Sequence, residues 1–190
     1  MITVDPLNLI QIMLAEGKNV NERRVPTKVL TELALVIALS VILKDVLPPI
    51  YPLPQGGSIT IAGLVPLFWF TLRRGFRFGV FAGAVYGLVH MALGGYVINP
   101  IQGLLDYPVA FAALGLAGLF KKYRLIGVGV GIGGRFICSF LSGLFFFLSP
   151  TLEGAVASAV YNGTYLVGEF VISAIVIYLL IKRGLLEIYL

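Results

Sequence analysis

Six long apolar runs, separated by short basic or Pro/Gly-rich segments, limit most strongly what this chain can fold into. About 20 mostly apolar residues are enough for a helix to cross a bilayer. Hydrophobic residues make up 58% of the chain and charged residues 12%, whereas soluble domains have about 45–50% and roughly 25%. The sequence therefore predicts an all-α integral membrane protein with six transmembrane helices, at residues 28–46, 59–72, 75–93, 100–120, 124–148 and 154–181.

The six runs use nearly the whole chain, so we expect one membrane domain with short ends. This domain spans residues 28–183, followed by a cytoplasmic tail over 184–190. Residues 1–27 are expected to form a cytoplasmic segment. Apolar residues recur there at helical spacing, which fits a short interfacial helix or a disordered tail equally well.

The basic residues indicate how the helices are oriented. The segments 47–58, 94–99 and 149–153 contain no lysine or arginine. Basic loops are retained in the cytoplasm, so we predict a multi-pass membrane protein with both termini inside. Twelve of the fourteen basic residues fall in the segments that six crossings bring to that side: Lys18, Arg23, Arg24, Lys28, Arg73, Arg74, Arg77, Lys121, Lys122, Arg124, Lys182 and Arg183.

One extracellular segment stands out by its composition. Residues 47–58 (LPPIYPLPQGGS) contain four prolines and two glycines, which exclude a regular helix. The segment is long enough to fold over a binding site.

Polar and aromatic side chains recur in the outer third of four predicted helices. Ionisable groups within a bilayer are costly and usually line a cavity or a pathway. We therefore predict a pocket that opens to the outside and binds a small molecule. Its candidate residues are Tyr86, His90, Asp106, Tyr107, Ser139, Phe146, Phe147 and Asn162.

Among these candidates, Asp106 points most directly to a ligand. Its carboxylate needs a partner, and no basic residue is expected in its layer, so a cationic ligand would supply one. Asn162, Ser139 and Tyr107 fit equally well as bridges between helices. The two phenylalanines also fit helix packing or an aromatic belt, and His90 also fits an interfacial position.

Two further charged residues lie near mid-membrane, on predicted helices that run antiparallel. We favour the interpretation that Arg135 and Glu169 form a structural ion pair that holds the bundle together over a role for them in ligand binding. No basic cluster is expected around the pocket, which argues against a phosphorylated ligand.

Several functions lack the residues they would need. The sequence has no Gly-x-x-x-x-Gly-Lys-Ser/Thr motif for ATP. With one histidine and one cysteine we expect no metal site, and we expect no cofactor. The basic residues are dispersed over membrane-edge loops, so we expect no nucleic-acid partner.

Four stretches resemble the thiamine-specific S-components of energy-coupling-factor (ECF) transporters. They are PQGGSITIAGLVPLFWFTLRRG, GGYVINPIQGLLDYPVAFAALGLAGLF, RFICSFLSGLFFF and VYNGTYLVGEFVISAI. The resemblance covers about residues 50–180 and implies six helices in the prokaryotic plasma membrane, with a vitamin bound near the outer face. It also implies three partners: a shared transmembrane coupling subunit and two ATPases.

The resemblance implies roles for particular residues. Asp106 and Tyr107 match the family's acidic-Tyr pair that meets the ligand, and Asn162 matches its asparagine in Tyr-Asn-Gly. Ala34 and Ala38 match its Ala-x-x-x-Ala docking motif, and such small residues let another helix approach closely.

The chain departs from the family pattern at four positions. Ser139 replaces a histidine, Phe147 a tryptophan and Ala157 a tyrosine, and Asp106 is shorter than the usual glutamate. The ligand could therefore be thiamine, a thiamine precursor or another flat heterocyclic vitamin.

Two other classes of function stay open. One is a self-sufficient secondary transporter that uses Asp106, Glu169 and Arg135 as a proton relay. The other is a membrane enzyme, although the sequence shows no nucleophile–base pair or metal site, so we expect no catalytic residue.

Overall fold

The structure is a computed structural model that describes residues 26–187. The chain divides into two compact units, Met1–Glu32 and Leu33–Leu190. Of the first unit, the structure describes only residues 26–32, which contain the first turns of helix α2. The expected N-terminal segment 1–27 lies almost entirely outside the described residues, as does the end of the expected tail.

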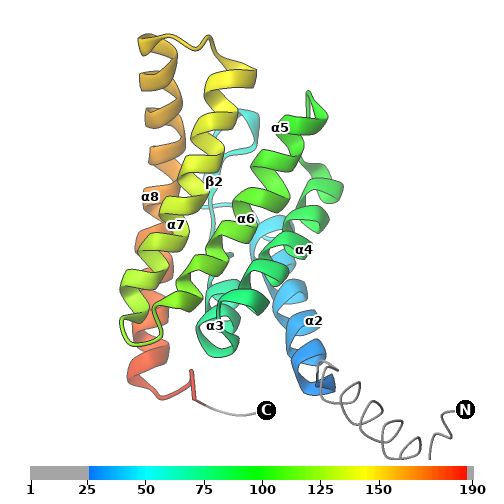
Figure 1. Ribbon diagram of the computed structural model, residues 1–190, viewed down its shortest axis with the longest axis vertical. Coiled ribbons are helices and arrows are strands. Elements are labelled where there is room, and N and C mark those ends of the chain that lie inside the picture. Colours follow the sequence, from blue (N-terminus) through cyan, green and yellow to red (C-terminus); the bar gives the residue numbers. More distant parts are fainter. Residues whose placement is uncertain (1–25, 188–190) are drawn as a thin grey trace, which may run out of the picture. The chain divides into compact units, whose positions relative to one another are not determined.

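Within residues 26–187, six helical segments lie where six apolar runs predict them (Figure 1). Five of them begin and end within two residues of the prediction, which confirms the all-α class. The segments are α2 (Thr27–Val41) with η1 (Ile42–Val46); α3 (Val65–Arg74); α4 (Phe76–Gly94); α5 (Pro100–Leu104), η3 (Leu105–Val109), α6 (Ala110–Ala112) and η4 (Ala113–Leu119), which form one continuous run; α7 (Arg124–Ser142) with η5 (Gly143–Phe147); and α8 (Leu152–Lys182).

The second helix differs from its prediction over 59–72, because it begins only at Val65. Side-chain contacts with α8 hold the backbone before it. Both the backbone nitrogen and Oγ1 of the fully buried Thr60 donate to Oε1 of Glu169, at 3.1 and 2.7 Å. Ala62 then adopts a left-handed conformation (φ 62°) that a helix does not allow. The apolar residues before Val65 therefore form turns.

Four helices of the described part are long and apolar enough to cross a membrane: Phe76–Gly94, Pro100–Leu119, Arg124–Phe147 and Leu152–Lys182. The other two helical segments differ for simple reasons. Helix α3 has ten residues, and the segment from α2 through η1 carries four charged side chains.

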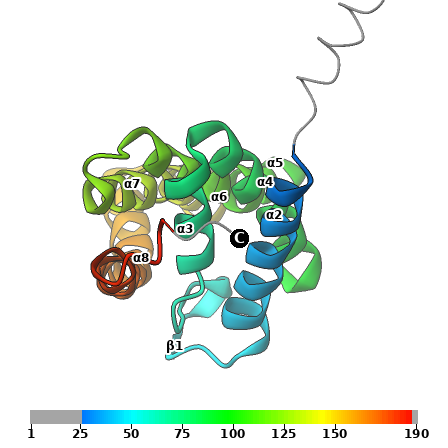
Figure 2. The ribbon, with the colours of Figure 1, turned by 90° about the horizontal axis from the view of Figure 1, so that it is seen from below.

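Close helix crossings within the second unit fix the position of the 100–119 run (Figures 1 and 2). This run packs against α4 on one side and α7 on another, and α7 packs against α8. A Cβ atom on Gly83 would lie 2.1 Å from the carbonyl oxygen of Phe111, and one on Gly115 would lie 2.3 Å from the nitrogen of Val80. Glycine is required at both positions, because the two backbones touch there.

The proline-rich segment folds into a short hairpin. Strands β1 (Tyr51–Pro52) and β2 (Ser58–Ile59) pair antiparallel, with Tyr51 opposite Ile59. Between them, Gln55 and Gly56 take positive φ angles of 62° and 91°. We call residues 51–59 the lid hairpin.

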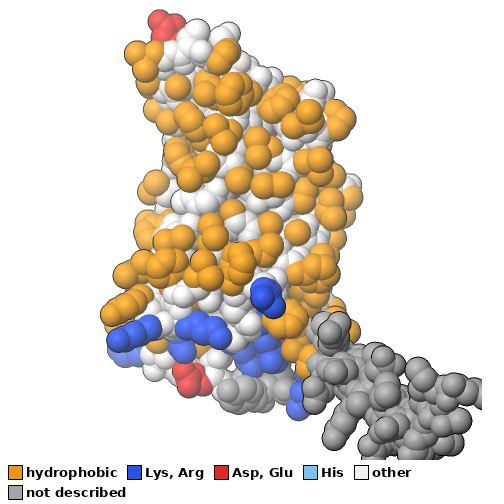
Figure 3. All heavy atoms as spheres, viewed as in Figure 1, with side chains coloured by type: hydrophobic (Ala, Val, Ile, Leu, Met, Phe, Trp, Pro, Cys, Tyr) orange, Lys and Arg blue, Asp and Glu red, His pale blue; other side chains and the backbone are white. Residues whose placement is uncertain are grey.

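The surface of the second unit suits a bilayer. Apolar side chains cover most of the face in Figure 3, and lysine and arginine gather toward one end. Outward-facing residues of the long helices include Leu88, Val109, Ile137 and Val167, which are between 48% and 61% exposed. Such exposed apolar side chains are stable in contact with lipid.

Candidate functional site

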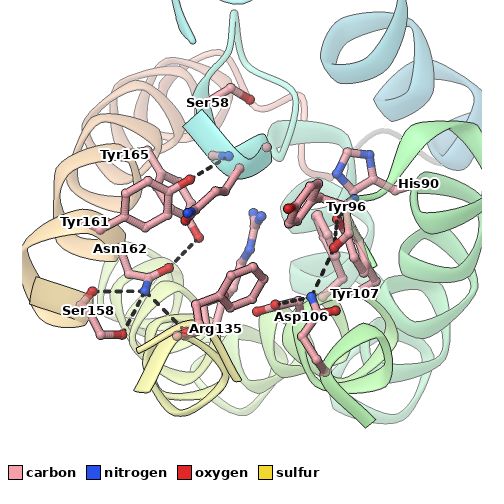
Figure 4. A pocket seen from close by; sticks show the side chains of 18 of the residues that line it. Ser58, His90, Tyr96, Asp106, Tyr107, Arg135, Ser158, Tyr161, Asn162 and Tyr165 are labelled. Carbon is pink, nitrogen blue, oxygen red and sulfur yellow. Dashed lines mark hydrogen bonds between the residues drawn. The ribbon is translucent and has the colours of Figure 1, made fainter. Parts of the chain in front are cut away.

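A cavity of about 240 Å³ lies among α4, the 100–119 run, α7 and α8, and the lid hairpin borders it (Figure 4). Residues 55–58 of the hairpin line it, so the proline-rich segment borders the cavity. Six of the eight residues predicted to form a pocket share this cavity: His90, Asp106, Tyr107, Ser139, Phe147 and Asn162.

The remaining two, Tyr86 and Phe146, are not brought to the cavity wall. Tyr86 is fully buried and donates to Oδ2 of Asp45 at 3.0 Å, so it supports the bundle. The other oxygen of Asp45 bonds Nδ1 of His90. His90 therefore lines the cavity but is anchored to the end of the first helix. Phe146 is half-buried in the helical turn that places its neighbour Phe147 in the wall.

Asp106 has one carboxylate oxygen engaged and the other free. Oδ2 accepts from Nε2 of Gln102 at 2.7 Å and from Oγ of Ser142 at 2.5 Å. Within residues 26–187, Oδ1 accepts no hydrogen bond and Asp106 forms no ion pair. Asp106 is thus held in place by its neighbours, with an acceptor available to a cationic or hydrogen-bond-donating ligand.

Aromatic rings line the cavity close to Asp106. The backbone nitrogen of Tyr96 donates to the hydroxyl of Tyr107 at 2.5 Å, which ties Tyr107 to the segment before α5. The Tyr96 ring lies 5.9 Å from that of Phe147. Tyr96 is not among the residues predicted from the sequence; it lies in the loop before α5, outside the predicted helices. Such rings suit a flat ligand and favour a positive charge.

Asn162 bridges two helices and also lines the cavity. Its Nδ2 donates to the carbonyl oxygens of Ser158 (2.9 Å) and Ser139 (3.2 Å), so it bridges α8 to α7. Its Oδ1 accepts from the hydroxyl of Tyr165 at 3.0 Å. Asn162, Ser158 and Tyr165 all line the cavity, as Figure 4 shows for the labelled side chains. Ser158 and Tyr165 had been missed.

The lid hairpin is held on α8 by one tyrosine. The hydroxyl of Tyr161 accepts from the backbone nitrogen of Gly57 at 3.0 Å and donates to the carbonyl oxygen of Pro54. The family pattern has a tyrosine at the position of Ala157. Here a tyrosine lines the same wall one helical turn later, at Tyr161.

The predicted ion pair between Arg135 and Glu169 is wrong. Glu169 is fully buried and pairs instead with Lys44, whose Nζ lies 3.1 Å from Oε1. Thr60 completes the site with its two hydrogen bonds to the same oxygen. The prediction paired two charged residues on the antiparallel helices α7 and α8. In the structure, Lys44 at the end of the first helical segment forms the ion pair with Glu169 on α8.

Arg135 lies instead against the Phe111 ring, with its guanidinium carbon 4.0 Å from the ring centroid. Both Lys44 and Arg135 line the cavity. Two basic side chains therefore reach the cavity wall, although the sequence led us to expect no basic cluster around the pocket. No group of three or more potential metal ligands occurs among the described residues.

The two alanines of the small-residue motif are exposed on α2. Leu35 and Leu39 beside them are 57% and 47% exposed. This surface, which we call the alanine strip, consists of Ala34 and Ala38.

The family described as "Thiamine transporter protein (Thia_YuaJ)" matches residues 30–187. A thiamine transporter ThiT of Bacillus subtilis (strain 168) is 37% identical in an alignment of 171 residues, and the match covers 80% of this chain and 88% of the relative. A thiamine transporter ThiT of Lacticaseibacillus paracasei is 30% identical in an alignment of 138 residues, and the match covers 60% of this chain and 69% of the relative.

A solved structure of ThiT from Listeria monocytogenes has the same fold. It superimposes with a TM-score of 0.70 at 26% identity, over 82% of this chain and 93% of that one. This agreement and the sequence matches together decide the family. This chain belongs to the thiamine transporter protein family.

Proposed function

We propose that this chain is the thiamine-binding S-component of an ATP-driven ECF-type importer. Its family consists of transporters and not of enzymes, and its bacterial relatives and apolar helices indicate a multi-pass protein of the plasma membrane. The observation that carries the proposal is the cavity, where a free carboxylate oxygen on Asp106 adjoins Tyr96, Tyr107 and Phe147.

Thiamine has the chemistry that this cavity favours. It has two flat rings, an aminopyrimidine and a positively charged thiazolium, joined by a methylene group, and it carries a hydroxyl group. Asp106 balances its charge or accepts a hydrogen bond from its amino group, the aromatic rings contact its faces, and Asn162 adds directional contacts. Ser139, also in the wall, leaves more room than the family's histidine would.

The purified chain should therefore bind thiamine without transporting it alone. We expect one-to-one binding by titration calorimetry, no accumulation in proteoliposomes holding this chain alone, and ATP-dependent accumulation once partners are added. Proton-driven accumulation by the chain alone would instead support the secondary transporter, with Asp106, Glu169 and Arg135 as relay. Tighter binding of an aminopyrimidine precursor would change the ligand but not the class.

The proposed partners are a transmembrane coupling subunit and two ATPase subunits. Their need is supported by the lack of an ATP-binding motif in this chain. The exposed alanine strip supports contact with a partner helix, since small side chains allow close helix approach.

The proposed orientation places both termini in the cytoplasm. In the sequence, residues 1–27 precede the membrane domain over 28–183, and residues 184–190 follow it. It is supported by the basic side chains that gather toward one end (Figure 3). Leu93, Thr151 and Lys122 are exposed and suit cysteine labelling. In a Cys138→Ser background, Leu93→Cys and Thr151→Cys should react with an impermeant maleimide on intact cells. Lys122→Cys should react only after lysis, and its labelling from outside would reverse the orientation.

A further inference from the structure

Arg135 is a buried cavity residue that the proposed function has not yet used. It is 5% exposed, yet its Nε and Nη1 have no hydrogen-bond partner within the described part of the chain. It lines the cavity, and Figure 4 shows its side chain directed inward. A buried guanidinium with unsatisfied donors is unstable unless an acceptor meets it, especially at membrane depth.

The neighbours of Arg135 do not supply that acceptor. Phe111 contacts the face of the Arg135 guanidinium. The N–H bonds of the guanidinium lie in its plane, so the ring does not accept them. Glu169 is already paired with Lys44 and Thr60 through Oε1. Its Oε2 has no partner either, so a water molecule between Glu169 and Arg135 is the competing arrangement.

Asp106 is held at a different level of the cavity. It bonds Ser142, which follows Arg135 by seven residues on α7. At a rise of 1.5 Å per residue, this places the two α7 backbone positions roughly 10 Å apart along the helix axis. The cavity thus offers a free acceptor at Asp106 and free donors at Arg135.

We infer that Arg135 selects the ligand by donating a hydrogen bond to an acceptor atom of the ligand. This inference rests on the proposed function. The pocket then requires a ligand with two distinct features. One is a positive charge or a donor for Asp106, and the other is a neutral acceptor atom for Arg135. In thiamine, the acceptors are the two pyrimidine ring nitrogens and the hydroxyl oxygen.

Ligand analogues test this contact without altering the protein. Three analogues of thiamine each lack one acceptor: a pyridine in place of either pyrimidine nitrogen, or hydrogen in place of the hydroxyl. Calorimetry on the wild-type chain should show that one analogue binds about 10- to 100-fold more weakly than thiamine, the usual effect of losing a charge-assisted hydrogen bond.

The same analogues are then compared on Arg135→Met and on a matched control, Arg124→Met, the same change outside the cavity. The wild-type preference should fall below about threefold in Arg135→Met and persist in Arg124→Met. Equal binding of all analogues to the wild-type chain would overturn the inference. A preference that persists in Arg135→Met would also overturn it, because the group that donates to the ligand's acceptor would then be Asn162 or Tyr165.

The measurements also separate this inference from the proposed function. Failure of thiamine to bind the wild-type chain would contradict the proposed function and this inference with it. Normal thiamine binding with no preference among the analogues would overturn the role of Arg135 alone. The analogue series on the wild-type chain decides this even if Arg135→Met does not fold.

Discussion

Replacing Asp106 by alanine should weaken thiamine binding by about 2–3 kcal/mol, or roughly 30- to 150-fold. The variant removes the free Oδ1 that faces the cavity, and Gln102 and Ser142 then lose their shared acceptor. Titration calorimetry with thiamine measures the change directly. Affinity that is unchanged in this variant would remove Asp106 from the site.

An isosteric control separates charge from shape at the same position. Asp106→Asn keeps the size and one carbonyl oxygen but loses the negative charge. It should lose most of the affinity for cationic thiamine while leaving the affinity for an uncharged aminopyrimidine less affected. Equal losses for both ligands would indicate that Asp106 contributes by hydrogen bonding rather than by its charge.

Changing both alanines of the alanine strip to leucine should abolish thiamine uptake and leave binding nearly intact. Ala34 and Ala38 are exposed on α2 and do not line the cavity. Larger side chains would keep a partner helix at a distance, because close helix approach needs small residues. Uptake of labelled thiamine is measured in cells that carry the coupling and ATPase subunits, and binding is measured on the purified variant.

The matched control enlarges two exposed residues on another helix. Val160 and Val167 on α8 are 64% and 61% exposed. The double change of these valines to leucine should leave uptake near the wild-type level. Normal uptake by the alanine variant would assign docking to another surface. Loss of its binding would show that the strip supports the fold, contrary to the separation expected here.

The helices and much of the site could be predicted from the sequence, because hydrophobic run length is a local property. A run of apolar residues that is long enough to cross a bilayer favours a membrane helix, and five segments lie within two residues of their predictions. The depth of Asp106, Tyr107 and Asn162 follows from their position along those helices. Their meeting in one cavity follows because helices of similar length cross the same layer.

The start of the second helix and the pairing of buried charges were decided only by tertiary structure. Apolar residues before Val65 read as helix, but their backbone is held by Glu169 through Thr60, more than 100 residues apart in the sequence. Lys44 pairs with Glu169 because the first helix ends beside α8, which no spacing along the chain reveals.

The same reason explains which site residues were missed. Tyr96 and Tyr161 gain their roles by contact with Tyr107 and with the lid hairpin, which are brought to them by folding. Arg135 was predicted to pair with Glu169, but Glu169 pairs with Lys44 instead. Within the described residues, Nε and Nη1 of Arg135 have no hydrogen-bond partner. The length of an apolar run along the sequence determines where each helix lies. Which buried groups meet depends on distances between helices, and only the folded chain sets those.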